Sequence, residues 1–239
     1  MKKILLSAAA LSVAAVLPTL SSAAASTATT LTGMTPRQVL ATTLRAAAAQ
    51  RTADSVVTTS TQGLTLRAVT ESGPSSGIGY LNVNGHRGEI IYLKGVVYAR
   101  FDPAIVKFEL NSTNASVANK WISITRTSRY YSNLAEGDTL PSVLQELSPA
   151  GTLSMSTTSF SGRNVIALTG TSNATVGVPG GVQTLYVSPS APFLPVGGDI
   201  RAITSGVSID LVIQMKNWGA KVDVHAPSTS TPITTTPLK

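Results

Sequence analysis

The residue with the best claim to chemistry in this sequence is a serine between two glycines. Gly73 to Gly77 fits the pattern G-x-S-x-G, in which Ser75 would be the nucleophile of a serine hydrolase. That chemistry needs the serine on a turn from a strand into a helix, with a histidine and an acid later in the chain. Here the pattern of Ile78 to Leu81 predicts a strand, and Pro74 among small residues is typical of a hairpin loop. A hydrolase is therefore a distant third hypothesis.

The histidines and carboxylates have no metal-binding or acid–base pattern. His86 and His225 are the two histidines, and neither has a histidine or carboxylate two or four positions further on. The candidate carboxylates are spread over predicted loops and helices: Glu109, Glu136, Asp138 and Glu146. Two glycine-rich pieces, Val178 to Gly181 and Val196 to Asp199, lack the lysine and the following helix of a phosphate loop, and we predict that they are turns. We expect no metal, no cofactor and no enzymatic activity.

The composition excludes several other classes of protein. The chain has 239 residues and no cysteine, which rules out disulfide scaffolds, thiolate metal sites and a lipidated N-terminal cysteine. Hydrophobic residues make up 43% and charged residues 12%, which argues against disorder of the whole chain. The formal charge of +7 is small and scattered, so we expect no nucleic-acid partner.

The first 25 residues have the pattern of a secretory signal peptide. Lys2 and Lys3 form a positive start, Ile4 to Leu17 is uncharged and apolar, and Ala23 to Ala25 offers small residues for a signal peptidase. The apolar run of about fourteen residues is short of the roughly twenty that span a membrane. We predict cleavage near Ala25 and a protein that is secreted or associated with the cell envelope, without a lipid anchor.

The remaining chain predicts one helix followed by many strands. Thr35 and Gln38 form a capping box around Pro36, so we expect a helix to Gln50 or Arg51. Its predicted buried stripe is Leu40, Leu44, Ala47 and Ala48. Ten segments have the pattern of strands: Ser55–Thr61, Leu64–Thr70, Ile78–Val83, Gly88–Leu93, Val96–Phe101, Trp121–Thr125, Val165–Gly170, Gln183–Val187, Val207–Met215 and Lys221–Val224.

Turn signals between these segments predict an antiparallel meander. Asn84-Gly85 and Lys94-Gly95 sit where tight hairpin turns belong. Short helices are expected at Pro103–Leu110, Thr113–Lys120 and from Leu140 to Leu147, while Gly151 to Gly162 has the pattern of a strand or loop. We therefore predict an α+β domain with a single antiparallel sheet over residues 34–226. A flexible segment (26–33) precedes it and a disordered Thr/Pro-rich tail (227–239) follows it.

Four pieces of the chain resemble a known family. They are Lys94 to Ala99, Asn119 to Ile124, Thr184 to Val187 with Pro195-Val196, and Gln214 to Val224 with Pro227. In this order and spacing they resemble the LolA-like lipoprotein carriers, most closely the actinobacterial LppX/LprAFG lipoprotein family, over roughly residues 34 to 227. The resemblance implies a curved half-barrel whose concave face, covered by helices, holds acyl chains. The lipobox cysteine of that family is missing here.

The alternation of polar and apolar residues predicts which side chains face inward. If Arg67, Glu89 and Lys216 point to water, the inner face carries Leu64, Leu66, Ile90, Tyr92, Ile209, Leu211, Ile213 and Met215. Val222 and Val224 follow by the same argument. Leu40, Leu44, Tyr98 and Leu144 complete the candidate lining of a lipid cavity.

The sequence leaves two main hypotheses for function. The first is an exported, monomeric binding or carrier protein for acylated lipids or glycolipids of the cell envelope, because few large side chains are available to fill a curved sheet. The alternative is a secreted, non-catalytic interaction module with the same fold and a closed core.

Overall fold

The computed structural model describes residues 31, 33–61, 63–111, 116–135, 139–173, 180–204 and 206–233. The predicted signal peptide, nearly all of the segment 26–33 and the last six residues lie outside this part of the chain. Residues 113–115 of the predicted helix Thr113–Lys120 also lie outside it, and 116–119 form turns.

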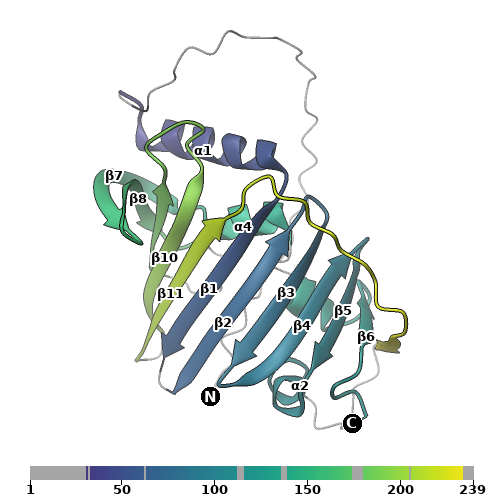
Figure 1. The fold of residues 1–239 in the computed structure, drawn as a ribbon. Helices are drawn as coiled ribbons and strands as arrows, with labels where there is room; N and C mark the ends of the chain where they lie inside the picture. The colour runs from purple at the N-terminus through teal and green to yellow at the C-terminus, as the bar shows by residue number, and fades with distance from the viewer. Residues whose placement is uncertain are drawn as a thin grey trace.

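The described chain forms twelve strands and four helices (Figure 1). The helices are α1 (Pro36–Gln50), α2 (Pro103–Glu109), α3 (Tyr131–Ala135) and α4 (Leu140–Glu146). The strands are β1 (Ala53–Thr61), β2 (Leu64–Ser72), β3 (Ser76–Val83), β4 (His86–Leu93), β5 (Val96–Phe101), β6 (Ile122–Thr125), β7 (Ala150–Phe160), β8 (Arg163–Thr171), β9 (Val182–Val187), β10 (Pro195–Thr204), β11 (Val207–Lys216) and β12 (Thr231–Ile233).

All twelve strands belong to one open sheet. Their order across the sheet is β12-β6-β5-β4-β3-β2-β1-β11-β10-β9-β8-β7. Every neighbouring pair is antiparallel except β12 and β6, which are parallel. The predicted α+β class and curved, half-barrel sheet are confirmed.

Helix α1 begins as its sequence predicts. Thr35 is the N-cap, its hydroxyl accepts a hydrogen bond from the Gln38 backbone N–H, and Gln38 Oε1 accepts one from the Thr35 N–H at 2.8 Å. Arg51 ends the helix in the left-handed conformation, with φ 67°. The buried stripe, however, consists of Val39, Thr43 and Ala47, one residue earlier than predicted in the first two turns.

The two predicted hairpin turns are confirmed. Asn84 and Gly85 have φ values of 51° and 88°, and Lys94 and Gly95 have 52° and 78°. Positive φ at both central residues matches the right-handed twist of the flanking strands, so these dipeptides fix the registers of β3 with β4 and of β4 with β5.

The helices pack against one face of the sheet, which we call the inner face. Residues of α1 and α4 form one apolar cluster with β8, β9, β11 and the start of β1. Residues of α2 and α3 form a second cluster with β3, β5, β6 and β12. The buried Gln183 side chain donates a hydrogen bond to the Glu146 carbonyl and so ties α4 to this face. The two clusters lie toward opposite ends of the sheet.

Three sequence-based expectations about elements differ from the structure. Val196 to Asp199 lies inside β10 and is not a turn. The segment Gly151 to Gly162, predicted as strand or loop, lies mostly in strand β7, an edge strand with exposed Ser and Thr side chains. Lys221–Val224 has no strand, because residues 217–230 leave β11 and cross the upper ends of β1–β5 to reach β6 (Figure 1). There Thr231–Ile233 forms β12, so this part of the predicted tail is paired with the sheet.

Candidate functional site

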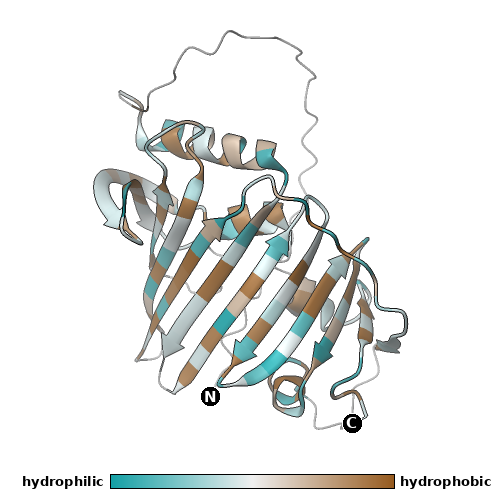
Figure 2. Ribbon diagram, viewed as in Figure 1, coloured by the Kyte–Doolittle hydropathy of each residue, from teal (hydrophilic) through white to brown (hydrophobic). Residues whose placement is uncertain are grey.

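The pairing register places most of the predicted lining residues on the inner face. Leu66 lies opposite Thr59, and Thr59 lies opposite Leu211, so these three share one row. A second cross-strand row runs from Met215 on β11 to Ile90 on β4. Ile213 and Tyr92 each lie two residues away on the same strands and therefore share this face. Figure 2 shows the alternation of hydrophobic and hydrophilic residues along these strands. Leu64 and Ile209 also have inward parity.

These inward residues are divided between the clusters. Leu40, Leu44, Leu144, Leu211, Ile213 and Met215 belong to or pack against the cluster beneath α1 and α4. Leu64, Leu66, Ile90 and Tyr92 pack against the cluster beneath α2 and α3. Ile209 is buried with Ile200 in a small third cluster, which Leu211 also contacts.

Three predicted inward residues are not on this face. Tyr98 lies opposite Ile91 in the register, whereas the inward Tyr92 lies opposite Val97, so Tyr98 points to the other face of the sheet. Successive residues of a strand point to opposite faces, and the face of Tyr98 follows from the register of β5 with β4, which the sequence alone does not show. Val222 and Val224 lie in the irregular segment that follows β11 and not on an inward-facing strand.

A band of half-buried apolar side chains lies between the two main clusters. We call it the inner-face band; its members are Val57, Leu64, Leu66, Ala68, Leu81 and Leu211. All six have inward parity on the adjacent strands β11, β1, β2 and β3. The residue between Leu66 and Leu211 is the small Thr59, whose hydroxyl donates to the Asp210 carbonyl. Large apolar side chains therefore flank a short polar one, and none of the six is fully covered by the helices.

A polar group lies beside the inner face near the hairpin of β4 and β5. The Tyr131 hydroxyl donates a hydrogen bond to the Tyr92 hydroxyl at 3.4 Å. Burial, and then the hydrogen bond with Tyr92, raises the pKa of Tyr131. Hydrogen bonds with Tyr131 and Tyr92 raise the pKa of the exposed Arg126, which remains a cation. This arrangement places one positive charge and two phenol hydroxyl groups next to an apolar surface.

The opposite face, which we call the outer face, carries a polar pair made of the half-buried Tyr186 and the buried Asp199. The Tyr186 hydroxyl donates to the Asp199 carboxylate, and Phe160 stacks on the Tyr186 ring with centroids 4.2 Å apart. Burial and the hydrogen bond to Asp199 raise the pKa of Tyr186 to about 12. Both side chains belong to paired strands, β9 and β10, so this pair connects two strands at the sheet surface.

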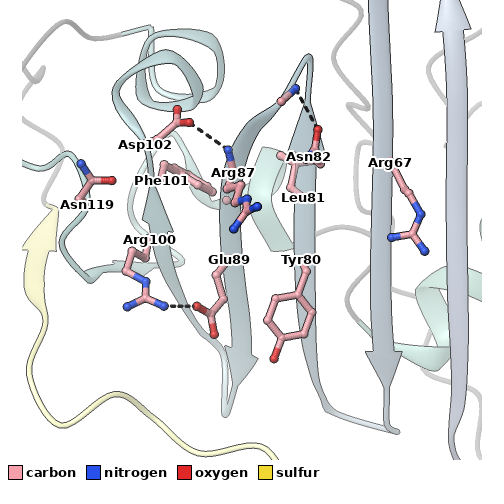
Figure 3. A pocket seen from close by; sticks show the side chains of 12 residues that line it. Arg67, Tyr80, Leu81, Asn82, Arg87, Glu89, Arg100, Phe101, Asp102 and Asn119 are labelled. Atoms are coloured by element: carbon pink, nitrogen blue, oxygen red, sulfur yellow. Dashed lines mark hydrogen bonds and ion pairs between the residues drawn. The ribbon is translucent and has the colours of Figure 1, made fainter.

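A hollow of about 640 Å³ also lies on the outer face, across β2 to β5 (Figure 3). Its side chains are largely polar and include Arg67, Tyr80, Arg87, Glu89 and Arg100. The sequence does not reveal this hollow, because alternation predicts only that the polar residues of each strand face solvent. Their common strand parity was the available signal.

The serine and the two histidines, which are the candidates for catalysis or metal binding, lie in three different segments of the chain. Ser75 is exposed in the connection from β2 to β3 and is followed by a strand, as the sequence predicts. His86 Nδ1 lies 3.1 Å from Asp102, and His225 Nε2 lies 3.0 Å from Asp223. Among the described residues, no three of His, Asp and Glu gather as a metal ion would require. No helix in this part of the chain is long and apolar enough to cross a membrane.

Comparisons with known proteins give a likeness in fold. No family model matches the sequence, and no curated protein matches it either. Among solved structures, the crystal structure of lipoprotein LppX from Mycobacterium tuberculosis matches with a TM-score of 0.51 and 14% identity, covering 80% of this chain and all of LppX. A DUF1329 family protein from Desulfovibrio piger matches with a TM-score of 0.30 and 9% identity, covering 78% of this chain and 94% of its own. The chain therefore has an LppX-like fold.

Proposed function

We propose that the protein binds or carries acylated lipids or glycolipids of the cell envelope, with an acyl chain lying along the inner-face band. The observation that carries this proposal is that Leu64, Leu66, Leu81 and Leu211 face the covered side of the sheet yet remain only half-buried. Apolar side chains left partly exposed between two packed clusters are typical of a binding surface for an apolar ligand. The likeness in fold to a lipoprotein supports the same function.

The energy available to such a ligand is sufficient for stable binding. Burial of a chain of about sixteen carbons is worth on the order of 10 kcal/mol at roughly 0.8 kcal/mol per CH₂, before ordering costs. Ordering costs of about 4 kcal/mol leave roughly 6 kcal/mol, which corresponds to a Kd of tens of micromolar. No covalent chemistry is needed for this function.

The polar group beside the inner face gives the ligand a direction. In this proposal the headgroup lies near Arg126, Tyr131 and Tyr92, because a cation and phenol hydroxyls suit its oxygen atoms. The acyl chain then extends from this end toward Leu66 and Leu211.

The proposed site of action is outside the cytoplasm. The pattern of the first 25 residues supports export, and the absence of cysteine from the sequence supports a protein that is released without a lipid anchor. We further propose that it acts as a monomer.

The proposal is tested by what the protein carries when it is purified from its own secretion route. The protein is extracted with organic solvent in parallel with native mass spectrometry of the intact complex. We expect acylated species in stoichiometric amounts and a native mass above that of the chain. A protein that is repeatedly empty and takes up no fatty acid from vesicles would instead be the interaction module with a closed core.

A further inference from the structure

The outer-face hollow lies on well-paired strands and is large enough to bind a ligand. It lies across β2 to β5, on the face opposite the inner-face band, and encloses about 640 Å³. That volume is within the usual range for ligand sites. Its strands are held in register by the two hairpins at Asn84-Gly85 and Lys94-Gly95. The lining side chains therefore stand on a rigid part of the sheet.

The two carboxylates in the hollow already have partners. Asp102 accepts hydrogen bonds from the backbone N–H groups of Ala104, Ile105 and Arg87 and contacts His86 Nδ1. Burial alone would raise the pKa of Asp102, but these hydrogen bonds outweigh it and lower the pKa. Asp102 therefore stays ionised, and among the described residues it forms no ion pair with Arg67 or Arg87.

The second carboxylate, Glu89, is occupied by an arginine. Arg100 Nη2 donates to Glu89 at 2.6 Å, and the Arg100 guanidinium also lies over the Trp121 ring, 5.0 Å from its centroid. The pair is thus neutral as a unit and fixed at one end by the aromatic ring.

Two arginines of the hollow, Arg67 and Arg87, have no ion-pair partner among the described residues, and the hollow as a whole has a net positive charge. Arg67 lies opposite Asn82, and Asn82 lies opposite Arg87, so the three form one cross-strand row on β2, β3 and β4. Two strand spacings separate the arginines by about 10 Å at the backbone. Asn82 Oδ1 accepts from the Gly85 N–H, so the amide nitrogen of this side chain remains a hydrogen-bond donor in the row. The row is cationic and rich in donors, which suits an anion.

An exposed aromatic ring stands beside this row. Tyr80 is two residues before Asn82 on β3, has the same strand parity, and is 47% exposed. Burial, and then the charges of Glu89 and Glu71, raises the pKa of Tyr80, so the phenol stays neutral at physiological pH. A neutral ring with a hydroxyl offers a flat apolar surface and a hydrogen bond at the same place. A sugar ring has a matching arrangement, because C–H groups on its face can lie on the aromatic ring and hydroxyl groups at its edge can hydrogen-bond to the phenol.

We infer that the outer-face hollow binds an anionic carbohydrate, a sugar that carries a carboxylate or phosphate group. The acid group lies between Arg67 and Arg87 and accepts from Asn82, and an adjoining sugar ring lies on Tyr80. A short acidic peptide would satisfy the arginines but would not need the ring. This site lies on the other side of the sheet from the proposed lipid site and is independent of it.

The test uses three probes of similar length. They are an oligogalacturonate, the neutral oligosaccharide maltohexaose and an oligoglutamate, each titrated into the protein by calorimetry at low and at high salt. We expect the oligogalacturonate to bind at least about tenfold more tightly than either of the others, and more weakly as salt rises. Oligoglutamate binding as tightly as the oligogalacturonate, or no oligogalacturonate binding at all, overturns the inference.

Matched variants locate the binding on this face. Arg67→Gln and Arg87→Gln should each weaken oligogalacturonate binding about tenfold, since each removes hydrogen bonds to a charged group. Tyr80→Ala should weaken the oligogalacturonate and leave any residual oligoglutamate binding unchanged. Arg163→Gln, an exposed arginine at the start of β8, is the control and should bind as the wild type does. If all three variants bind the oligogalacturonate as the control does, the hollow is not the site.

Discussion

The inner-face band predicts a large effect of charge at two positions. Leu66 and Leu211 flank Thr59 in one row and are each half-buried. Full burial of a leucine is worth roughly 1.5–3 kcal/mol, so a ligand that covers the part still exposed gains up to about 1 kcal/mol at each. In the variant Leu66→Asp the ligand loses that gain. It must also remove water from a carboxylate, which costs several kcal/mol more.

These terms set the expected loss of binding. A total of about 3 kcal/mol or more corresponds to at least about a hundredfold weaker binding, because each 1.4 kcal/mol is a factor of ten. Leu211→Asp should act in the same way, and the double variant should not bind. The measurement is displacement of a fluorescent fatty acid, with the free energy of unfolding of each variant determined by urea.

The control for this prediction lies on the same strand. Val69 of β2 is half-buried like Leu66 but has outward parity. Val69→Asp should lower stability by an amount similar to Leu66→Asp and leave fatty-acid binding unchanged. If Leu66→Asp binds the probe as tightly as Val69→Asp, the acyl chain does not lie on the inner-face band and the reasoning fails.

Three further predictions concern stability. Asp102→Ala should lower the free energy of unfolding by about 1–2 kcal/mol, because α2 loses its N-cap. Since the pKa of Asp102 is lowered in the folded chain, urea melts should show the full difference from the wild type above about pH 4 and a smaller one at lower pH. A difference that does not change with pH would contradict this prediction. Gly197→Ala should destabilise by about 2 kcal/mol or more in urea, because its Cβ would meet the Ile213 carbonyl, whereas a wild-type midpoint would show that β10 can shift. Tyr186 should titrate near pH 12 when phenolate absorbance is followed. Because the folded chain holds this proton more tightly than the unfolded chain, the contribution of Tyr186 to stability should fall as pH rises from about 10 to about 12. Tyr186→Phe should remove the late titration, and a variant whose titration curve matches the wild type would contradict this assignment.

Local signals in the sequence were enough for α1 and for the central strands. The capping box at Thr35 and Gln38 depends on residues three positions apart, and the hairpin at Asn84-Gly85 depends on two adjacent residues. Such short-range chemistry is readable without knowledge of the fold. The alternation along β11 likewise predicts that Ile209, Leu211, Ile213 and Met215 share one face, and the register with β1 and β10 places them on the inner face.

Long-range contacts explain what the sequence did not predict. Gly197 and Gly198 resemble a turn locally, but they lie within β10 because other parts of the chain approach them closely. A Cβ at Gly198 would lie 3.0 Å from the Leu147 side chain of the segment that ends α4, a contact that only the folded chain reveals. Strand β12 is set by pairing with β6 and not by its own short, polar sequence.

The candidate site was partly predictable for the same reasons. Parity alone identified Leu64, Leu66 and Leu211, because each lies in a strand with clear alternation. Parity could not place Tyr98, since the register of β5 depends on β4. The outer-face hollow needs three strands in register before Arg67 and Arg87 share a row, and no pattern within one strand reveals that.

The position of a bound acyl chain is the most direct test of the proposed function. A fatty acid with a photoreactive group along its chain is bound to the protein, irradiated and mapped by peptide mass spectrometry, with heat-unfolded protein as the control. We predict adducts on inward residues of β2 and β11, around Leu66 and Leu211. Adducts confined to outward residues such as Val69, or no labelling above the unfolded control, would contradict it.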